Sequence, residues 1–321
     1  LLLAAGCQTA QLFVPARSPS VGDIVWNSFG AIVGMAIGWL ALATVPTVEQ
    51  AGRFVYAAAI TGLWLLAELA PWVPTLSLSS IRDNLAQVIA PQWSWSSALV
   101  SASGLFAVGL FLRSCIASRH LQMALIALIA IVAAGKLLVI GVGLEVGSAA
   151  GLLAGYWTFM LAWRYFRSEL TTFAFLLLFL AITIRGVDPF VLRDEPGAWT
   201  WMPFVSWLKG SMSANLKALG TSLFLYGSLL SLIASMRKHV LTSGLMLAAW
   251  VGLLEIVQLW IEAPPPDVSE PLLAAAIALA IRALGPGHDD PHVLAPISVS
   301  AASVPSQRPS LARGLLVLVA A

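Results

Sequence analysis

The chain has 321 residues, of which 59% are hydrophobic and only 10% are charged, and its formal net charge is +2. With a mean hydropathy of +0.90, this composition excludes an ordinary soluble domain and is typical of a protein with several membrane spans. The small, scattered positive charge also excludes nucleic acid as a partner, because no block of Lys and Arg is present to contact phosphates.

Apolar runs long enough to cross a bilayer as a helix recur along the whole chain. We expect ten spans, at residues 1–14, 22–46, 54–71, 96–113, 121–142, 146–163, 170–186, 216–236, 240–261 and 268–284. In lipid only a helix satisfies its own backbone polar groups within a single segment. The predicted fold is therefore all-α, a polytopic bundle of transmembrane helices.

The connections between these spans suggest where the chain divides. The two longest, 72–95 and 187–215, are rich in Trp and Pro and suit the headgroup level of a membrane. The tail 285–312 has no periodic pattern and is predicted to be a disordered linker before a further hydrophobic segment. Because the chain begins with LLLAAG and ends with GLLVLVAA, inside hydrophobic runs, we expect it to be a piece of a longer protein.

Positive residues alternate between the connections and predict the orientation. One side receives Arg53, Arg113, Arg119, Arg164, Arg167, Arg237, Lys238 and Arg282. The short connections of the other side carry little beyond Arg17 and Arg82. By the positive-inside rule the first side is cytoplasmic, and the protein is expected in a bacterial cytoplasmic membrane with its polar loops outside.

Polar residues gather where the first two expected spans meet. Gln8 and Gln11 are three residues apart and so share one helix face. The next span carries a stripe at 4, 3, 4 spacing, with Arg17 in the turn before it; the stripe consists of Asp23, Asn27, Gly30 and Gly34. The adjacent helices bring these polar side chains into one region.

A second copy of this pattern follows 247 residues later. Placed without a gap, it matches Gln11 with Gln258, while Glu255 replaces Gln8 and Glu270 replaces Asp23. A third helix pair, with Lys136 on one span and a glycine series on the next, is a more degenerate match in an ambiguous register; that series is Gly147, Gly151 and Gly155.

These residues resemble the VanZ-like family, whose pattern reads Glu-x-x-Gln, a short loop with Arg, then Asp-x-x-x-Asn-x-x-Gly-x-x-x-Gly. Six positions match: Gln11, Arg17, Asp23, Asn27, Gly30 and Gly34. Gln8 departs from the family's Glu. The resemblance implies two VanZ-like helix-loop-helix repeats. It divides the chain into the end of one unit at 1–46, a middle membrane region at 47–186, a second unit at 187–284 and a tail at 285–321.

Each feature also has a simpler interpretation. The spacings from Ser20 to Asp23 and from Asp267 to Glu270 both fit a capping box, in which the acidic residue serves only the start of its helix. Gly30, Gly34 and Gly38 form a small-residue ridge, for which helix packing is the favoured interpretation. Arg17 is either an interfacial anchor or a bidentate partner for phosphate or carboxylate.

Ionisable residues inside spans are costly in a bilayer and usually face a partner or a wet cavity. Glu68, Lys136 and Glu255 are such residues, and the alternation of the spans places all three at one side of the membrane. The alternatives are a shared polar pocket or separate side chains that reach the interface.

We therefore expect an extracytoplasmic pocket that recognises an anionic or glycan-bearing amphiphile, such as a lipid-linked cell-wall precursor. The candidate ligand-binding residues are Gln8, Gln11, Arg17, Asp23, Asn27, Lys136, Glu255, Gln258 and Glu270. The family name implies a role in glycopeptide resistance or envelope polysaccharide handling. The alternatives are a membrane enzyme that uses Glu255 as an acid or base on a lipid-linked substrate, a transporter, and a scaffold.

No cofactor or metal is expected at this pocket. The four histidines all fall on the opposite side of the membrane: His120, His239, His288 and His292. Membrane lipids are the expected partners. The two cysteines, Cys7 and Cys115, do not make a disulfide framework.

Overall fold

The computed structural model describes residues 48–70, 82, 84–85, 93–139, 143–204, 212–236, 239–262 and 266–284. The N-terminal polar motif, from Gln8 to the glycine ridge that ends at Gly38, lies outside the described residues. The tail after Leu284 lies outside them as well.

Eight long helices make up the described part of the chain. They are α3 (Val48–Leu69), α5 (Trp95–Arg113), α6 (Ser118–Leu138), α7 (Val146–Tyr165), α8 (Leu170–Val187), α10 (Met212–Ser235), α11 (Val240–Gln258) and α12 (Ser269–Leu284). Their helical character agrees with the prediction from the apolar runs. Isolated bridges pair Leu192 with Ile261 and Thr200 with Asp267.

Local chemistry accounts for several helix ends. The Ser94 side chain accepts a hydrogen bond from the Ser97 N–H at 3.1 Å and so caps the start of α5. At the end of α8, Asp188 precedes a proline and has an extended backbone, a conformation that the residue before proline favours. Pro271 lies in the first turn of α12, where its missing N–H has no helical partner to lose.

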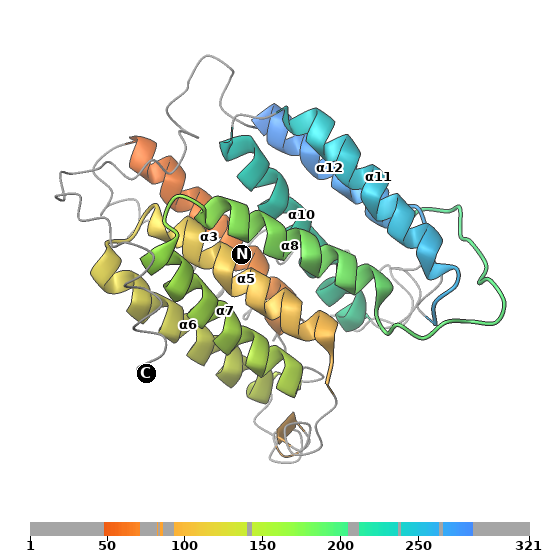
Figure 1. Cartoon of the computed structure of the whole chain (residues 1–321), viewed down its shortest axis with the longest axis horizontal. Coiled ribbons are helices and arrows are strands. Elements are labelled where there is room, and N and C mark those ends of the chain that lie inside the picture. Colours follow the sequence, from red (N-terminus) through yellow and green to blue (C-terminus); the bar gives the residue numbers. More distant parts are fainter. Residues whose placement is uncertain are drawn as a thin grey trace, which may run out of the picture.

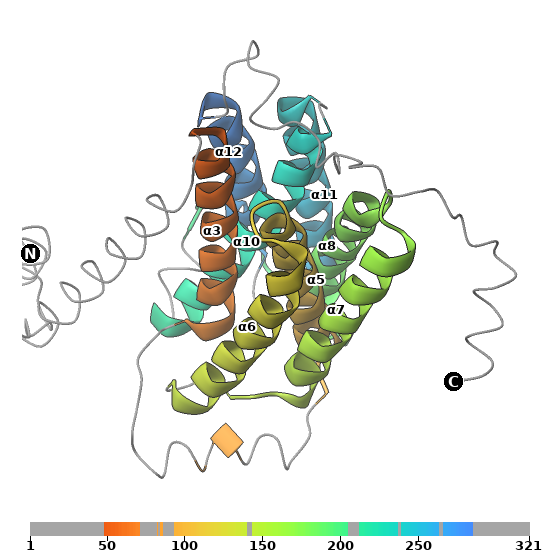
Figure 2. The ribbon, with the colours of Figure 1, turned by 90° about the vertical axis from the view of Figure 1, so that its left-hand side faces the viewer.

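The helices run along one common direction as a single bundle (Figures 1 and 2). A central group consists of α3, α5, α8 and α10, in which α3 and α8 each pack against both α5 and α10. The pair α6 and α7 lies along one edge of this group and the pair α11 and α12 along the opposite edge (Figure 1). Large side chains fill the interior; Trp64, Phe106, Phe159 and Phe224 are fully buried.

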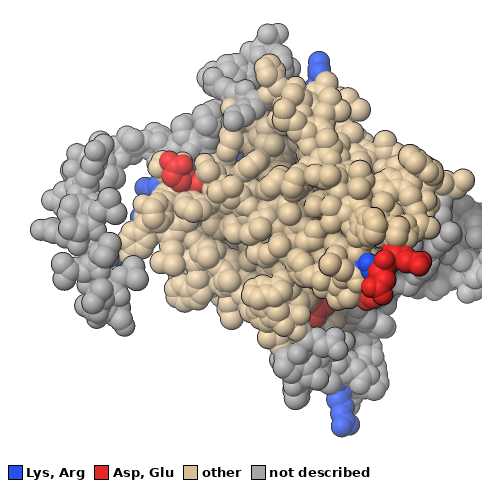
Figure 3. Space-filling view, turned by 45° about the vertical axis from the view of Figure 1, so that its right-hand side comes forward, with Lys and Arg blue, Asp and Glu red and all other residues tan. Residues whose placement is uncertain are grey.

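Six of the described helices are long and apolar enough to cross a membrane: α5, α6, α7, α8, α10 and α11. Their outer faces expose large apolar side chains, among them Leu153, Trp157 and Leu161 on α7. In Figure 3 the middle of the surface in view carries almost no charge, and the charged groups lie toward its margins. The described chain is therefore an integral membrane bundle, because such a surface is stable in lipid and not in water.

Six of the ten predicted spans fall on described helices that are long and apolar enough to cross a membrane, and the number ten stays a prediction. Two predicted spans, 1–14 and 22–46, lie outside the described residues. The predicted spans 54–71 and 268–284 form the helices α3 and α12, of which α12 has only 16 residues.

Glycines on α7 bring this helix close to α5. A Cβ on Gly151 would collide with the Ala98 carbonyl oxygen, and one on Gly155 would lie 2.5 Å from the Ala102 oxygen. Small residues in this spacing let two backbones approach in a membrane. The predicted degenerate motif therefore contains a packing ridge in its second helix.

Candidate functional site

Ionisable side chains gather at one end of the bundle. Glu68, Lys136, Arg185 and Glu255 occupy the last turns of α3, α6, α8 and α11, while Ser148 and Glu270 occupy the first turns of α7 and α12. Successive helices alternate in direction, so these ends coincide. The sequence placed Glu68, Lys136 and Glu255 together, and they lie at this common end.

The first cluster is a closed ring of four buried side chains. The Lys136 ammonium pairs with a Glu68 carboxylate oxygen at 2.5 Å and donates to the Ser148 hydroxyl at 2.6 Å. Ser101 donates to the other Glu68 oxygen at 2.7 Å and lies 2.9 Å from the Ser148 hydroxyl. Glu68 and Lys136 are each only 4% exposed. They are paired inside the protein and do not reach separately to the interface.

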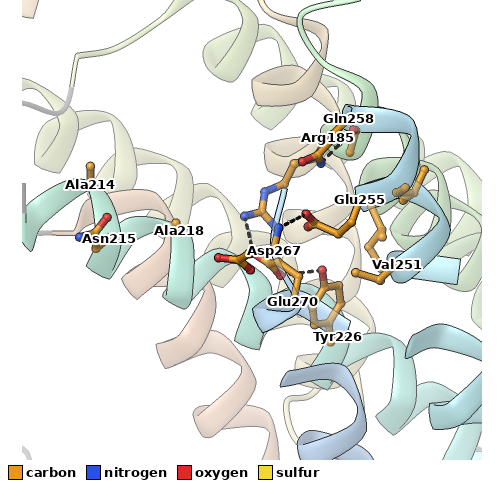
Figure 4. Close-up of a pocket in the computed structure, with 13 residues that line it drawn as sticks. Arg185, Ala214, Asn215, Ala218, Tyr226, Val251, Glu255, Gln258, Asp267 and Glu270 are labelled. Carbon is orange, nitrogen blue, oxygen red and sulfur yellow. Dashed lines mark hydrogen bonds and ion pairs between the residues drawn. The ribbon is translucent and has the colours of Figure 1, made fainter. Parts of the chain in front are cut away.

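The second cluster centres on Glu270 (Figure 4). One carboxylate oxygen of Glu270 accepts a hydrogen bond from the Ser222 hydroxyl at 2.9 Å and lies 3.5 Å from a guanidinium nitrogen of Arg185. The other oxygen accepts from the Tyr226 hydroxyl at 2.7 Å. Arg185 also donates to Ser222 at 3.0 Å. Helices α8, α10 and α12 thus meet at this carboxylate.

Glu255 is bound differently, because it serves the start of a neighbouring helix. Its carboxylate accepts a hydrogen bond from the Asp267 N–H at 3.0 Å, just before α12 (Figure 4). The Asp267 side chain in turn accepts from the Ser269 N–H at 2.7 Å. The first contact satisfies a buried N–H just before the helix, and the second satisfies the first N–H of the helix itself, which has no partner within it.

The capping interpretation of Glu270 is therefore wrong. In a capping box the acidic residue folds back to the N–H of the residue three positions earlier. Here that N–H belongs to Asp267 and is already bound by Glu255, so the Glu270 side chain turns toward α8 and α10.

A cavity of about 380 Å³ opens beside the second cluster. Its polar wall includes Arg185, Asn215, Glu255, Gln258 and Glu270, and α8, α10 and α11 supply its apolar wall. The Gln258 amide donates to the Gly186 carbonyl oxygen at 3.0 Å and ties the end of α11 to α8. Cavities of this size with a few polar groups are typical of ligand sites.

A second cavity of about 280 Å³ lies beside the Lys136 ring. Its walls include Ser96, Ser97, Glu145 and Lys217, together with the ring itself. Arg185, Ala214 and Ala218 line both cavities. The structure thus places Lys136 in one cavity and Glu255, Gln258 and Glu270 in its neighbour, rather than all of them in a single pocket.

A third cavity, of about 480 Å³, is mainly apolar. It lies between α8, α10 and α11, farther from the polar end of the bundle. Phe175, Phe179 and Trp250 line it. The Phe179 and Trp250 rings stack at 5.3 Å, and the Trp250 indole donates to the Thr183 hydroxyl at 3.2 Å. Phe179 and Trp250 lie directly next to the turns that carry Ile182 and Val251 of the polar cavity, so the polar and apolar cavities follow one another along α8 and α11.

One acidic residue just outside the spans, Asp188, has a raised pKa. Burial raises the pKa of the Asp188 carboxyl above its ordinary value, and the neighbouring Glu145 carboxylate raises it further. Asp188 directly follows α8 and Glu145 directly precedes α7. Negative charge is therefore already concentrated at this rim of the bundle.

Four residues of the second cluster were not among the sequence candidates: Arg185, Ser222, Tyr226 and Asp267. Arg185 carried a usable signal, since it is ionisable and lies inside an expected span. Ser222 and Tyr226 are four residues apart on one face of α10, but such a pair is ordinary in a packed helix. Only the packing of α10 against α12 distinguishes them.

Within the described residues, no group of three or more His, Cys, Asp or Glu side chains has an arrangement that would hold a metal ion. The chain matches no family model, no curated protein and no solved structure. The resemblance to the VanZ-like family therefore stays a prediction, and the case for function depends on the site itself.

Proposed function

We propose that this chain is a VanZ-like membrane protein of the cell envelope that binds the polar head of an anionic or glycan-bearing amphiphile at the end of its bundle. One observation carries the proposal: Arg185, Glu255 and Glu270 line an open cavity at the polar end of the bundle. Charged groups in a membrane segment are costly unless they serve an interaction. The cavity offers both a guanidinium for an anionic group and carboxylates for hydroxyl groups.

The apolar cavity supports an amphiphile over a soluble ligand. It follows the polar cavity along α8 and α11, and Phe175, Phe179 and Trp250 line it. A ligand with its head beside Arg185 has room for its hydrocarbon chain along the same helices. By the positive-inside rule the polar end faces outward, which suits a lipid-linked envelope precursor.

Native mass spectrometry of the purified full chain tests this function. The protein is exposed to a bacterial polar lipid extract supplemented with polyprenyl phosphate. We expect wild type to retain an amphiphile and Arg185→Gln to lose roughly tenfold in affinity, because a charge-assisted hydrogen bond is lost. Arg282→Gln, in the last turn of α12 at the opposite end, is the matched control. Equal retention by both variants would contradict the proposal.

A membrane enzyme acting on a lipid-linked substrate is the second candidate. Glu255 favours it, because this carboxylate lines the cavity and the described contacts engage only its Oε2 atom, through the Asp267 N–H. A general acid or base needs such access to its substrate. Glu255→Gln keeps the shape and the hydrogen-bond acceptor, so full turnover of a lipid-linked substrate by this variant would eliminate the candidate.

A further inference from the structure

The two polar clusters occupy matching places in two similar groups of helices. In the first group α6 packs on α3 and α5, and in the second α11 packs on α8 and α10. Across the centre, α5 contacts α8 and α10 contacts α3. The order α3, α5, α6, α7 is thus repeated by α8, α10, α11, α12, with both groups running in the same direction (Figure 1).

The side chains of the clusters match in the same order. Glu68 ends α3 as Arg185 ends α8, and Lys136 ends α6 as Glu255 ends α11. Ser101 on α5 matches Ser222 on α10, and the first-turn Ser148 of α7 matches the first-turn Glu270 of α12. The pairs are separated by nearly constant intervals of 117–122 residues. In two of the four pairs the sign of the charge is exchanged.

Because the sign of the charge is exchanged at these positions, the two adjoining cavities differ in the charge of their walls. In the smaller cavity Lys136 neutralises Glu68, and the remaining charged groups on its wall are Arg185, Lys217 and Glu145, beside several serine hydroxyls. In the larger cavity Arg185 is the one cation among the described lining residues, facing Glu255, Asp267 and Glu270. One cavity is rich in donors and positive charge, and the other is rich in carboxylates.

Arg185 stands between them, because it lines both cavities. Its guanidinium has five N–H donors, and its contacts with Ser222 and Glu270 are directed to the carboxylate side. A planar guanidinium can bind a phosphate in bidentate fashion. An anionic group in the smaller cavity would thus meet Arg185, Lys217 and serine hydroxyls together.

We propose that the two adjoining cavities form one bipartite site for an amphiphile whose phosphate is followed by an amine. The phosphate lies in the cavity lined by Ser96, Ser97 and Lys217. The ammonium lies among Glu255, Asp267 and Glu270, and Arg185 contacts the phosphate between them. The inference depends on the proposed amphiphile function and adds the chemistry of the head. Phosphatidylethanolamine and an amino sugar on a polyprenyl phosphate share this chemistry.

Binding of defined lipids to the full chain in detergent tests the proposal. Native mass spectrometry with an equimolar mixture compares phosphatidylethanolamine, phosphatidylglycerol and phosphatidylcholine, which share the phosphate and differ in the group after it. We expect wild type to prefer phosphatidylethanolamine by roughly tenfold, the effect of a charge-assisted hydrogen bond. Soluble phosphoethanolamine should compete for the site, and glycerol phosphate should compete roughly tenfold more weakly. A polyprenyl phosphate with an amino sugar, tested separately, distinguishes the two sources of the head.

The variants separate the two halves of the head. Lys217→Gln should weaken all phosphate lipids alike, several-fold, and Glu255→Gln should remove the preference for the amine and keep the phosphate binding. Their matched controls are Arg282→Gln and Glu262→Gln, which change the same charges outside both cavities. A thermal unfolding midpoint for each variant separates lost binding from lost folding.

The possible results distinguish a failure of the bipartite site from a failure of the proposed amphiphile binding. Equal binding of phosphatidylethanolamine and phosphatidylglycerol, with both weakened by Arg185→Gln, would overturn the amine half and keep the amphiphile function. Stronger binding of phosphatidylcholine than of either would overturn the bipartite site, because its quaternary amine has no N–H to donate. Binding of none of the probes, the polyprenyl phosphate included, would overturn both proposals.

Discussion

The carboxylate of Glu255 on α11 accepts a hydrogen bond from the Asp267 N–H at the start of α12, at 3.0 Å. A side chain on one helix therefore completes the end of the next. The contact also determines where Glu270 points, since it occupies the N–H that a capping Glu270 would bind. The contact thus leaves the Glu270 carboxylate to its partners on α8 and α10.

Glu255→Ala should destabilise the folded state and displace the Glu270 carboxylate. Loss of the acceptor leaves the buried Asp267 N–H without a partner, which costs about 1–3 kcal/mol in the free energy of unfolding. Glu255→Gln retains an acceptor oxygen and should lose less. Denaturant unfolding in mixed micelles measures both variants. Equal losses for Ala and Gln would show that the hydrogen bond is not the cause.

Because Lys136 and Glu68 form a buried pair, we expect a single substitution to lower the free energy of unfolding strongly and a double substitution to lower it only weakly. Lys136→Ala leaves Glu68 buried without its counter-ion, at a cost of about 3–5 kcal/mol in stability. The double variant Glu68→Leu with Lys136→Met removes both charges and should be much closer to wild type. Unfolding free energies of the three proteins test this order. A double variant as unstable as Lys136→Ala would contradict the ion-pair account.

Gly151→Ala should disturb the packing of α7 on α5. The added methyl group would meet backbone atoms of Ala98, which cannot rotate out of the way, so the helices must separate. We expect a loss of about 1–3 kcal/mol, measured by thermal or denaturant unfolding. Gly227→Ala on α10 is the matched control, because nothing lies within 4 Å of the new atom. It should be neutral or stabilising by about 1 kcal/mol.

Asp188 predicts a pH dependence of stability. Burial, and then Glu145, raise its pKa in the folded state, so the folded protein holds this proton more tightly than the unfolded chain does. As the pH rises above about 4, the ordinary aspartate pKa, the free energy of unfolding should fall until the folded-state pKa is passed. Asp188→Asn should remove that fall.

The measurement is the thermal unfolding midpoint of wild type and Asp188→Asn between pH 4 and 7. Glu145→Gln should reduce the fall in part, because it removes only the second cause. Asp194→Asn, at an exposed carboxyl in the same connection, is the control. Parallel curves for wild type and Asp188→Asn would show that another group is responsible.

The position of the site at one end of the bundle predicts the side from which it is reached. In a background with Cys7→Ala and Cys115→Ala, single cysteines replace Lys217 and Ser118, which lie near opposite ends of the bundle. An impermeant thiol reagent should label position 217 from outside intact cells and position 118 only after the membrane is opened. The reverse result would invert the orientation and place the cavities on the cytoplasmic side.

Sequence reasoning could predict the helices because an apolar run in lipid has only one structure that satisfies its backbone. It could also predict that Glu68, Lys136 and Glu255 share one end, since this depends only on the direction of successive spans and on the position within each. Arg185 was not among the sequence candidates, although it carries the same signal as Glu68, an ionisable group inside an expected span. The N-terminal motif from Gln8 to Gly38 lies outside the described residues and stays a prediction.

The sequence by itself determined that this protein is a helical membrane bundle with rare ionisable residues near one end, because hydrophobic length and span parity are properties of the chain alone. Tertiary structure decided which of these residues meet. Lys136 pairs with Glu68, whereas Glu270 meets Arg185, Ser222 and Tyr226, and Glu255 caps α12. These partners lie 12 to 85 residues apart and are chosen by helix packing, which no local spacing encodes.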